Sequence, residues 1–148
     1  MGTSHVGATD ELMPFGIDLS LAVFDRATLV ARGLFPGAEC LVILVKDGAT
    51  WRSHGDRAGL PSRDRAAEIV IASGEMLWIA DARSDPRFAE SPVVVGPPYL
   101  RAYIGAPIRL EDGSTPGVLV VASPEPIADD AAKAAQLQAL ADFVADEW

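Results

Sequence analysis

The apolar residues of this chain follow two different periods, and each change of period marks the boundary of a predicted element. Between residues 17 and 31 they recur every three or four positions, which predicts a helix that ends at Gly33. Further along, consecutive or alternating apolar residues and Asp-Gly turns predict antiparallel strands joined in hairpins. The predicted elements are, in chain order, a helix at 17–33, strands at 39–45 and 50–54, a helix at 63–73, strands at 76–80, 99–110 and 117–122, and a helix at 129–148.

Polar residues at the element ends refine this outline. Ser62 is the predicted N-cap of the second helix, and Gly74 is its predicted end. The last helix reaches Trp148 without a stop signal, so we expect the chain to be one module of a longer protein. Residues 1–16 mix Gly, Ser and Thr with few apolar positions, which predicts a flexible leader before a domain at 17–148.

One segment, residues 81–98, fits neither period. It contains Asp85-Pro86-Arg87-Phe88 and Gly96-Pro97-Pro98. Irregular segments of this length in compact domains usually carry function. This loop is therefore the predicted ligand-facing segment.

Composition narrows the class of protein. The 148 residues are 49% apolar and 22% charged, which is typical of one globular domain. Twelve basic against twenty-one acidic residues give a net charge of −9, which disfavours nucleic acid and acidic lipid as partners. The single cysteine, Cys40, lies in an apolar run and fits a reducing compartment. No signal peptide or membrane-length apolar run is evident, so we expect a cytoplasmic protein without a membrane partner.

The inventory of reactive side chains predicts neither a metal site nor catalytic residues. Cys40, His5 and His54 form no Cys/His cluster at zinc-ligand spacing. The sequence has no Gly-x-Ser-x-Gly elbow and no glycine-rich phosphate loop. Arg63 and Arg65, at the start of a predicted helix, suggest an anion site, but exposed arginines paired with Asp64 and Glu68 are the favoured interpretation.

Around the 81–98 loop, two interpretations stay open. Taken singly, each aromatic residue of the region is expected to pack in the core, but as a set they can line a pocket. For the charged residues, the simpler interpretation is that Asp85 accepts hydrogen bonds from its own turn and pairs with Arg87. The ligand-site hypothesis names the side chains of Trp78, Asp85, Arg87, Phe88, Tyr99, Arg101 and Tyr103.

Three segments together closely resemble the GAF domain family, in the variant found beside bacterial histidine kinase and diguanylate cyclase modules. They are residues 81–88, residues 92–108 with the run Gly-Pro-Pro-Tyr-Leu-Arg-Ala-Tyr-Ile-Gly-Ala-Pro-Ile, and residues 112–121 with an Asp-Gly turn before a buried strand. The resemblance covers about residues 17–148. It implies an α+β fold with a central antiparallel sheet in the order 2-1-5-4-3, the terminal helices on one face and a loop-covered pocket on the other.

Departures from GAF subfamily patterns narrow the range of ligands, cofactors and reactions that we expect for this chain. The chain contains no asparagine, so the Asn-Lys-Phe-Asp-Glu signature of cyclic-nucleotide-binding members is absent. One cysteine does not suffice for methionine sulfoxide reduction, which needs thiol attack and resolution. Cys40 also precedes the region where bilin-linking cysteines commonly lie. We therefore predict no cofactor, although haem ligation through His54 remains an alternative.

The resemblance predicts a non-catalytic sensor or regulatory domain of a bacterial signalling protein, such as a two-component system. It would bind an unknown small molecule, dimerise, or do both, to control a downstream output domain. A ligand-free dimerisation module and a small enzyme using the same pocket are the alternatives. For the homodimer we expect the first and last helices to form the interface, through the stripe Leu137, Leu140, Ala141, Val144 and Trp148. The alternative is that the whole stripe packs inside the monomer, against its own sheet.

Overall fold

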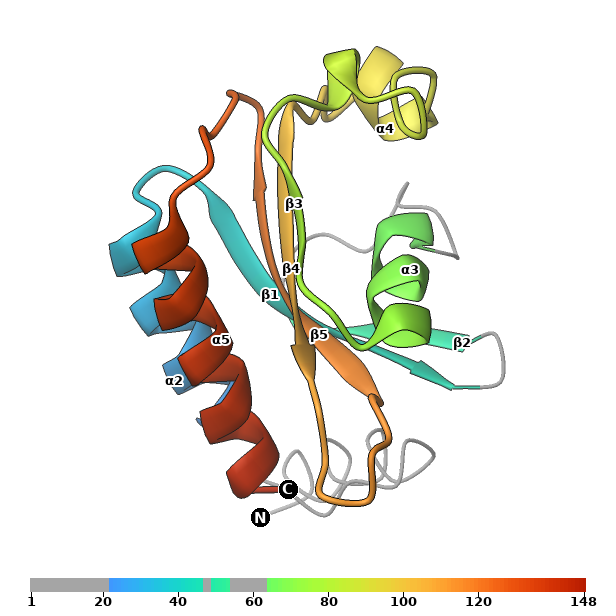
Figure 1. Cartoon of the computed structure of the whole chain (residues 1–148). Helices are drawn as coiled ribbons and strands as arrows, with labels where there is room; N and C mark the ends of the chain where they lie inside the picture. Colours follow the sequence, from blue (N-terminus) through green and yellow to red (C-terminus); the bar gives the residue numbers. More distant parts are fainter. Residues whose placement is uncertain (1–21, 47–48, 54–63) are drawn as a thin grey trace, which may run out of the picture.

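A computed structural model describes residues 22–46, 49–53 and 64–148. Five antiparallel strands form one sheet in the order β2-β1-β5-β4-β3, which confirms the predicted α+β fold and strand order. Helices α2 and α5 lie side by side on one face of this sheet, and α3 and α4 lie on the other (Figure 1). The elements are α2 (Ala22–Leu34), β1 (Glu39–Lys46), β2 (Ala49–Arg52), α3 (Arg65–Ser73), β3 (Leu77–Ile79), the 3-10 helix η2 (Ala82–Ser84), α4 (Pro92–Val95), β4 (Ala102–Ile108), β5 (Gly117–Ser123) and α5 (Ala131–Asp146).

Strand alternation divides the apolar residues between two cores. On β1, Val42 and Leu44 face α2 and α5, whereas Leu41 and Ile43 face the α3 side. Successive side chains of a strand point to opposite faces, so a strand covered on both faces is apolar throughout. This explains the continuous apolar runs of β1, β4 and β5.

On the helix face the core is closely packed. Phe24 of α2 and the α5 residues Leu137, Ala141 and Val144 have no exposed surface. The three α5 side chains belong to the stripe that the sequence assigned to a dimer interface. They are used inside this chain instead, because a helix lying on a sheet buries the face that it turns toward the sheet.

Two glycines permit close approach within the sheet. A Cβ on Gly117 would lie 2.6 Å from Leu44 Cδ2 and 2.8 Å from the carbonyl oxygen of Ile43. A Cβ on Gly105 would lie 3.1 Å from Val70 Cγ2 of α3 and 3.2 Å from the Tyr103 ring. Gly105 therefore lets α3 approach the sheet directly beside Tyr103.

Two predicted helix signals are corrected by the structure. Gly33 lies inside α2, which continues to Leu34, and the left-handed backbone (φ 84°) occurs at Gly37. The N-cap of α3 is Asp64, whose Oδ1 accepts a hydrogen bond from the Ala67 N–H; Ser62 lies outside the described residues. Gly74 ends α3 in the left-handed conformation, as predicted.

The predicted leader, residues 1–16, also lies outside the described residues. Within the described ranges, no helix is both long and apolar enough to cross a membrane.

Candidate functional site

A row of side chains across four strands forms the floor of a pocket. Ile79 of β3 pairs with Tyr103 of β4, Tyr103 pairs with Ala122 of β5, and Ala122 pairs with Glu39 of β1. Residues directly opposite in an antiparallel ladder project from the same face. All four therefore face α3, and all four line the pocket.

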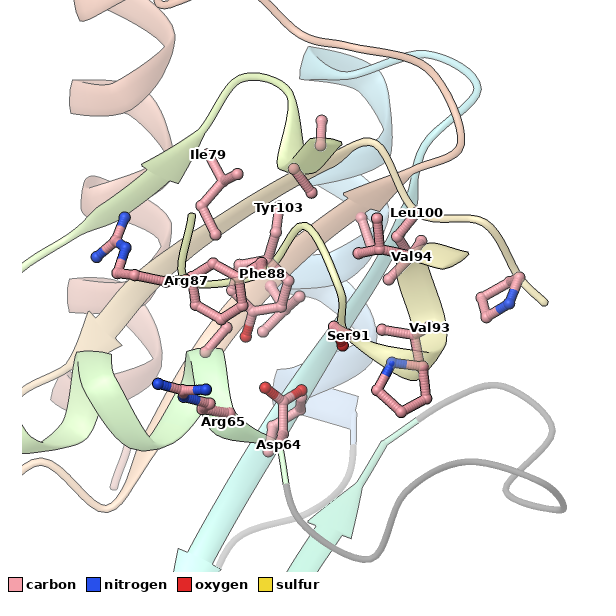
Figure 2. Close-up of a pocket in the computed structure, with 18 of the residues that line it drawn as sticks. Asp64, Arg65, Ile79, Arg87, Phe88, Ser91, Val93, Val94, Leu100 and Tyr103 are labelled. Atoms are coloured by element: carbon pink, nitrogen blue, oxygen red, sulfur yellow. The ribbon is translucent and has the colours of Figure 1, made fainter. Parts of the chain in front are cut away.

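The cavity above this floor has a volume of about 580 Å³ and lies between the sheet, the start of α3 and the 82–100 loop. Phe88, Val93, Val94 and Leu100 form an apolar roof (Figure 2). The charged residues Arg65, Arg87, Glu39 and Glu90 are exposed at the rim. An apolar chamber of this size with a few polar groups is typical of small-molecule sites.

An ion pair holds the base of the loop. Asp81 and Arg101 flank the 82–100 loop and bring its two ends together. The Arg101 guanidinium donates from Nε to Asp81 Oδ1 at 2.8 Å and from a terminal nitrogen to Oδ2 at 2.6 Å. The Arg101 hydrogen bond lowers the pKa of Asp81 to about 2. Asp81 also accepts from the Arg83 N–H and so caps the 3-10 helix that starts the loop. The pair fixes the loop over the floor without facing the cavity.

A second pair orders the middle of the loop. The Asp85 carboxylate accepts hydrogen bonds from the Arg87 backbone N–H and from two nitrogens of its guanidinium at 3.1 and 2.8 Å. The guanidinium carbon lies 5.3 Å from the centroid of the Phe88 ring. This confirms the simpler interpretation of Asp85 and Arg87. The pair holds the guanidinium at the cavity rim, beside the Phe88 ring that points into the cavity (Figure 2).

At the α3 end of the cavity, two oxygen-bearing side chains approach each other. Tyr103 is only 8% exposed, and its hydroxyl makes no hydrogen bond of ordinary length and angle with the described residues, although the Asp64 carboxyl lies close enough to act on it. Burial raises its pKa well above the usual range, and the nearby Asp64 carboxyl adds to this rise. Burial also raises the pKa of Asp64, against the lowering effects of the Ala67 N–H and of Arg52.

The structure brings three of the seven predicted site residues to the cavity wall: Arg87, Phe88 and Tyr103. Trp78 lies on the helix side, where its ring packs against Phe35 at 5.9 Å and its indole N–H donates to the Ile127 carbonyl at 3.1 Å. Asp85 and Arg101 make the ion pairs described above, and Tyr99 is 52% exposed with φ 59°. These four residues do not line the main cavity, although Trp78 and Asp85 border a shallow hollow beside it.

Sequence reasoning missed Asp64 as a site residue. It treated Asp64 as a surface partner of neighbouring arginines, whereas Asp64 caps α3 and lines the cavity. Asp is as good an N-cap as Ser, and this carboxylate stands directly before Arg65 and the buried Ala66. The strong preference of Asp for the N-cap position was the sequence signal that could have placed Asp64 at the start of α3.

Among the residues that the structure describes, groups suited to redox or metal chemistry are not gathered at this cavity. Cys40 faces the helix side of the sheet, and burial raises its thiol pKa to about 11. In the part of the chain that the structure describes, no three His, Cys, Asp or Glu side chains cluster as metal ligands. His54, the alternative haem ligand, lies outside the described residues.

The fold and site define a small α+β domain with a packed helix face and a ligand-sized pocket on the opposite face of one antiparallel sheet. The family model of the GAF domain matches residues 21–148, so the chain belongs to the GAF domain family. It is 33% identical over 107 residues to a cyclic di-GMP phosphodiesterase of Pseudomonas aeruginosa. That match covers 70% of this chain and 18% of the phosphodiesterase.

Solved structures share the fold at low sequence identity. The PixJ GAF domain of Thermosynechococcus elongatus in its blue-light-absorbing form superposes with a TM-score of 0.67 at 16% identity, over 84% of this chain and 82% of that domain. Free methionine-R-sulfoxide reductase of Neisseria meningitidis, solved with its substrate, gives 0.67 at 20% identity, over 86% of this chain and 76% of the reductase. These likenesses establish the fold alone, because the family includes photoreceptor and enzyme members.

Proposed function

We propose that this domain is a non-catalytic sensor that binds a small molecule in the cavity over Tyr103 and Ala122 and thereby regulates an output domain of a bacterial, cytoplasmic signalling protein. The observation that carries the proposal is the cavity of about 580 Å³ with a mostly apolar floor and an apolar roof. Its covering loop is tied down at the base by the Asp81–Arg101 pair. The GAF relationship and the match to a phosphodiesterase that is much longer than this chain support a regulatory role.

A non-catalytic role fits the chemistry of the pocket walls. The cavity is mostly apolar, and Cys40 lies on the opposite face of the sheet with its pKa raised to about 11. A thiol in that state is a poor nucleophile, since the thiolate is the reactive form. This argues against the reductase chemistry of the Neisseria meningitidis relative for this chain.

Hydrogen bonds connect the pocket loop to the segment before α5. The Ile127 N–H donates to the Ala80 carbonyl at 3.0 Å, and the Trp78 indole donates to the Ile127 carbonyl. Ala80 directly precedes Asp81, where the pocket loop begins. A ligand that shifts this loop would therefore act on the residues that lead into α5.

Filling the cavity tests ligand binding. Ala122→Phe places a ring on the pocket floor, whereas Ala135→Phe adds the same ring on the exposed side of α5. In a thermal-shift screen of a metabolite library, we expect at least one compound to stabilise the wild type and Ala135→Phe but not Ala122→Phe. A hit that stabilises Ala122→Phe equally would contradict the pocket assignment. If no compound stabilises the wild type, the alternative of a ligand-free dimerisation module is favoured.

Dimerisation is the second part of the proposal. The exposed apolar side chains of the helix pair are Leu29 and Val30 on α2, at 64% and 51%, and Phe143 on α5, at 36%. They lie outside the buried stripe and are suited to contact a second copy of the chain. An interface there would place two α5 helices near each other, so that a change in one pocket could reach a paired output domain.

Sedimentation equilibrium of the wild type and of Leu29→Glu tests this interface. We expect the wild type to be dimeric at tens of micromolar and Leu29→Glu to be monomeric. Val95→Glu is the matched control, because Val95 is 63% exposed on α4, on the opposite side of the sheet, and should leave the dimer intact. A monomeric wild type would refute the dimer, and a dimeric Leu29→Glu would refute this interface.

A further inference from the structure

The polar groups inside the cavity define which ligand chemistry fits it. We infer that the pocket binds a compact, mostly apolar molecule through a hydrogen-bond-donating head, a hydroxyl or an ammonium, placed between the Tyr103 hydroxyl and the Asp64 carboxylate. This inference rests on the proposed ligand-binding function and specifies the ligand class.

The first argument is the unsatisfied Tyr103 hydroxyl. It belongs to a side chain that is 8% exposed and lines the cavity, and it makes no hydrogen bond of ordinary length and angle with the described residues, although the Asp64 carboxyl lies close enough to act on it. Buried polar atoms in folded proteins are nearly always paired. In Figure 2 the Tyr103 side chain extends from the sheet toward the start of α3, so a ligand head at that end of the cavity would supply the missing partner.

The second argument is the character of the neighbouring group. Asp64 Oδ1 accepts from the Ala67 N–H at 2.8 Å, so the positive end of α3 already holds a carboxylate that belongs to the chain itself. A carboxylate is an acceptor with several lone pairs and takes further donors. A ligand carboxylate or phosphate at this place would meet a like charge, whereas a hydroxyl or ammonium would meet an acceptor.

The basic residues near the cavity do not reverse this preference. Arg87 is bound to Asp85, and Arg52 already has a partner. Arg65 is exposed at the rim, where Glu39 and Glu90 also stand. The inner end of the cavity therefore presents Asp64 and Tyr103 to a ligand, the Arg52 charge acts on both of these groups, and the rest of the wall is mostly apolar.

Four phenyl compounds that differ in their heads test the inference: ethylbenzene, 2-phenylethanol, 2-phenylethylammonium and phenylacetate. Dissociation constants are measured by NMR titration of the purified protein. We expect 2-phenylethanol and 2-phenylethylammonium to bind about tenfold more tightly than ethylbenzene, and phenylacetate to bind most weakly. Tighter binding of the alcohol than of the ammonium would identify a neutral head, and the reverse order a cationic one.

Two variants with matched controls locate the effect. Tyr103→Phe should reduce 2-phenylethanol binding to the level of ethylbenzene, whereas Tyr99→Phe, outside the cavity, should not. Asp64→Asn keeps an N-cap side chain but should weaken the ammonium and strengthen phenylacetate. Asp130→Asn makes the same change at the N-cap of α5, away from the pocket, and should change neither affinity.

The outcomes separate the two proposals. Saturable binding of ethylbenzene with no gain for the donor heads, or tightest binding of phenylacetate, would overturn the inference and leave the ligand-binding pocket standing. Equal losses in Asp64→Asn and Asp130→Asn would also overturn it, because the effect would then come from helix stability. Absence of saturable binding by all four compounds would count against the pocket itself.

Discussion

The two faces of the sheet are built from the same strands but differ in how completely they are packed. On the helix face, Leu119 of β5 is fully buried beneath α2 and α5. On the pocket face, Leu41 of the neighbouring strand β1 is 8% exposed and borders a cavity. A protein core is normally packed to the density of an organic crystal. The comparison therefore indicates that the helix face stabilises the domain and that the pocket face is packed less completely, as the proposed ligand-binding role requires.

The pocket face also carries titratable oxygen-bearing groups among its apolar residues. On the helix face, the Trp78 indole N–H donates to the Ile127 carbonyl. The pocket face holds a buried Tyr103 hydroxyl that makes no hydrogen bond of ordinary geometry with the described residues, and an Asp64 carboxyl whose pKa is raised by burial. Such groups cost stability and are found preferentially at functional sites.

Truncating one leucine on each face is expected to have the largest and most unequal effect. Leu119→Ala leaves a void in a closed core and should lower the free energy of unfolding by about 2–5 kcal/mol. Leu41→Ala enlarges an existing cavity and should cost less than about 2 kcal/mol, because fewer contacts are lost. Urea unfolding monitored by circular dichroism measures both. Equal losses would mean that the two faces are packed alike.

A methyl group beside Tyr103 should have a smaller effect. Gly105→Ala puts a Cβ within 3.0–3.2 Å of Val118, Val70 and the Tyr103 ring, which should cost about 1–3 kcal/mol through overpacking. Gly33→Ala is the control, since nothing lies within 4 Å of its added Cβ and alanine stabilises a helix by about 0.5–1 kcal/mol. The same unfolding measurement applies. An unchanged stability of Gly105→Ala would show that α3 is not held close to the sheet.

The sequence could predict where the strands lie and in what order, but not which face of the sheet each aromatic residue occupies. Periodicity and turns locate the strands, and the GAF resemblance supplies their order. The face of an aromatic residue depends on the register, which the sequence does not show. Trp78 pairs with Ile104 and so faces the helices, whereas its neighbour Ile79 pairs with Tyr103 and faces the pocket. A shift of one residue would exchange them.

The kind of residue that begins or ends each helix could be predicted from the sequence, but its exact position could not always be predicted. Gly33 and Gly37 are both reasonable stops, and burial of Phe35 at the end of α2 decides that the left-handed turn falls at Gly37. Ser62 and Asp64 are both good caps by type. For the loop, the sequence indicated its role, but the long-range Asp81–Arg101 pair depends on the loop ends meeting in space.

Removing the ion pair at the base of the loop should have the smallest effect on global stability. Asp81→Asn loses the charge that Arg101 holds, and amide hydrogens of the 82–100 loop should exchange faster with solvent. Asp85→Asn breaks a pair within the loop and should leave exchange of the Leu100 amide nearly unchanged. This amide donates to the Val93 carbonyl, and Leu100 directly precedes Arg101 at the loop base. Equal exchange at Leu100 in both variants and the wild type would contradict the role of the pair.

The same pair gives a pH dependence with a defined sign. The folded-state pKa of Asp81 is lowered to about 2 from an unfolded value of about 3.9. Its stabilising contribution is therefore complete above pH about 4 and is lost as the pH falls through 2. The difference in melting temperature between wild type and Asp81→Asn should be constant near neutral pH and shrink between pH 4 and 2. A difference that persists at pH 2 would exclude this ion pair as its cause.

The contrast between the faces is tested most directly by amide chemical-shift mapping during a titration with 2-phenylethanol. The account predicts saturable shifts that cluster at the start of α3, around Phe88 in the loop and on the Tyr103 and Ala122 floor, with little change at Phe24 and Leu137. Saturable shifts centred on α2 and α5, or spread evenly over both faces, would contradict the assignment of binding to the pocket face.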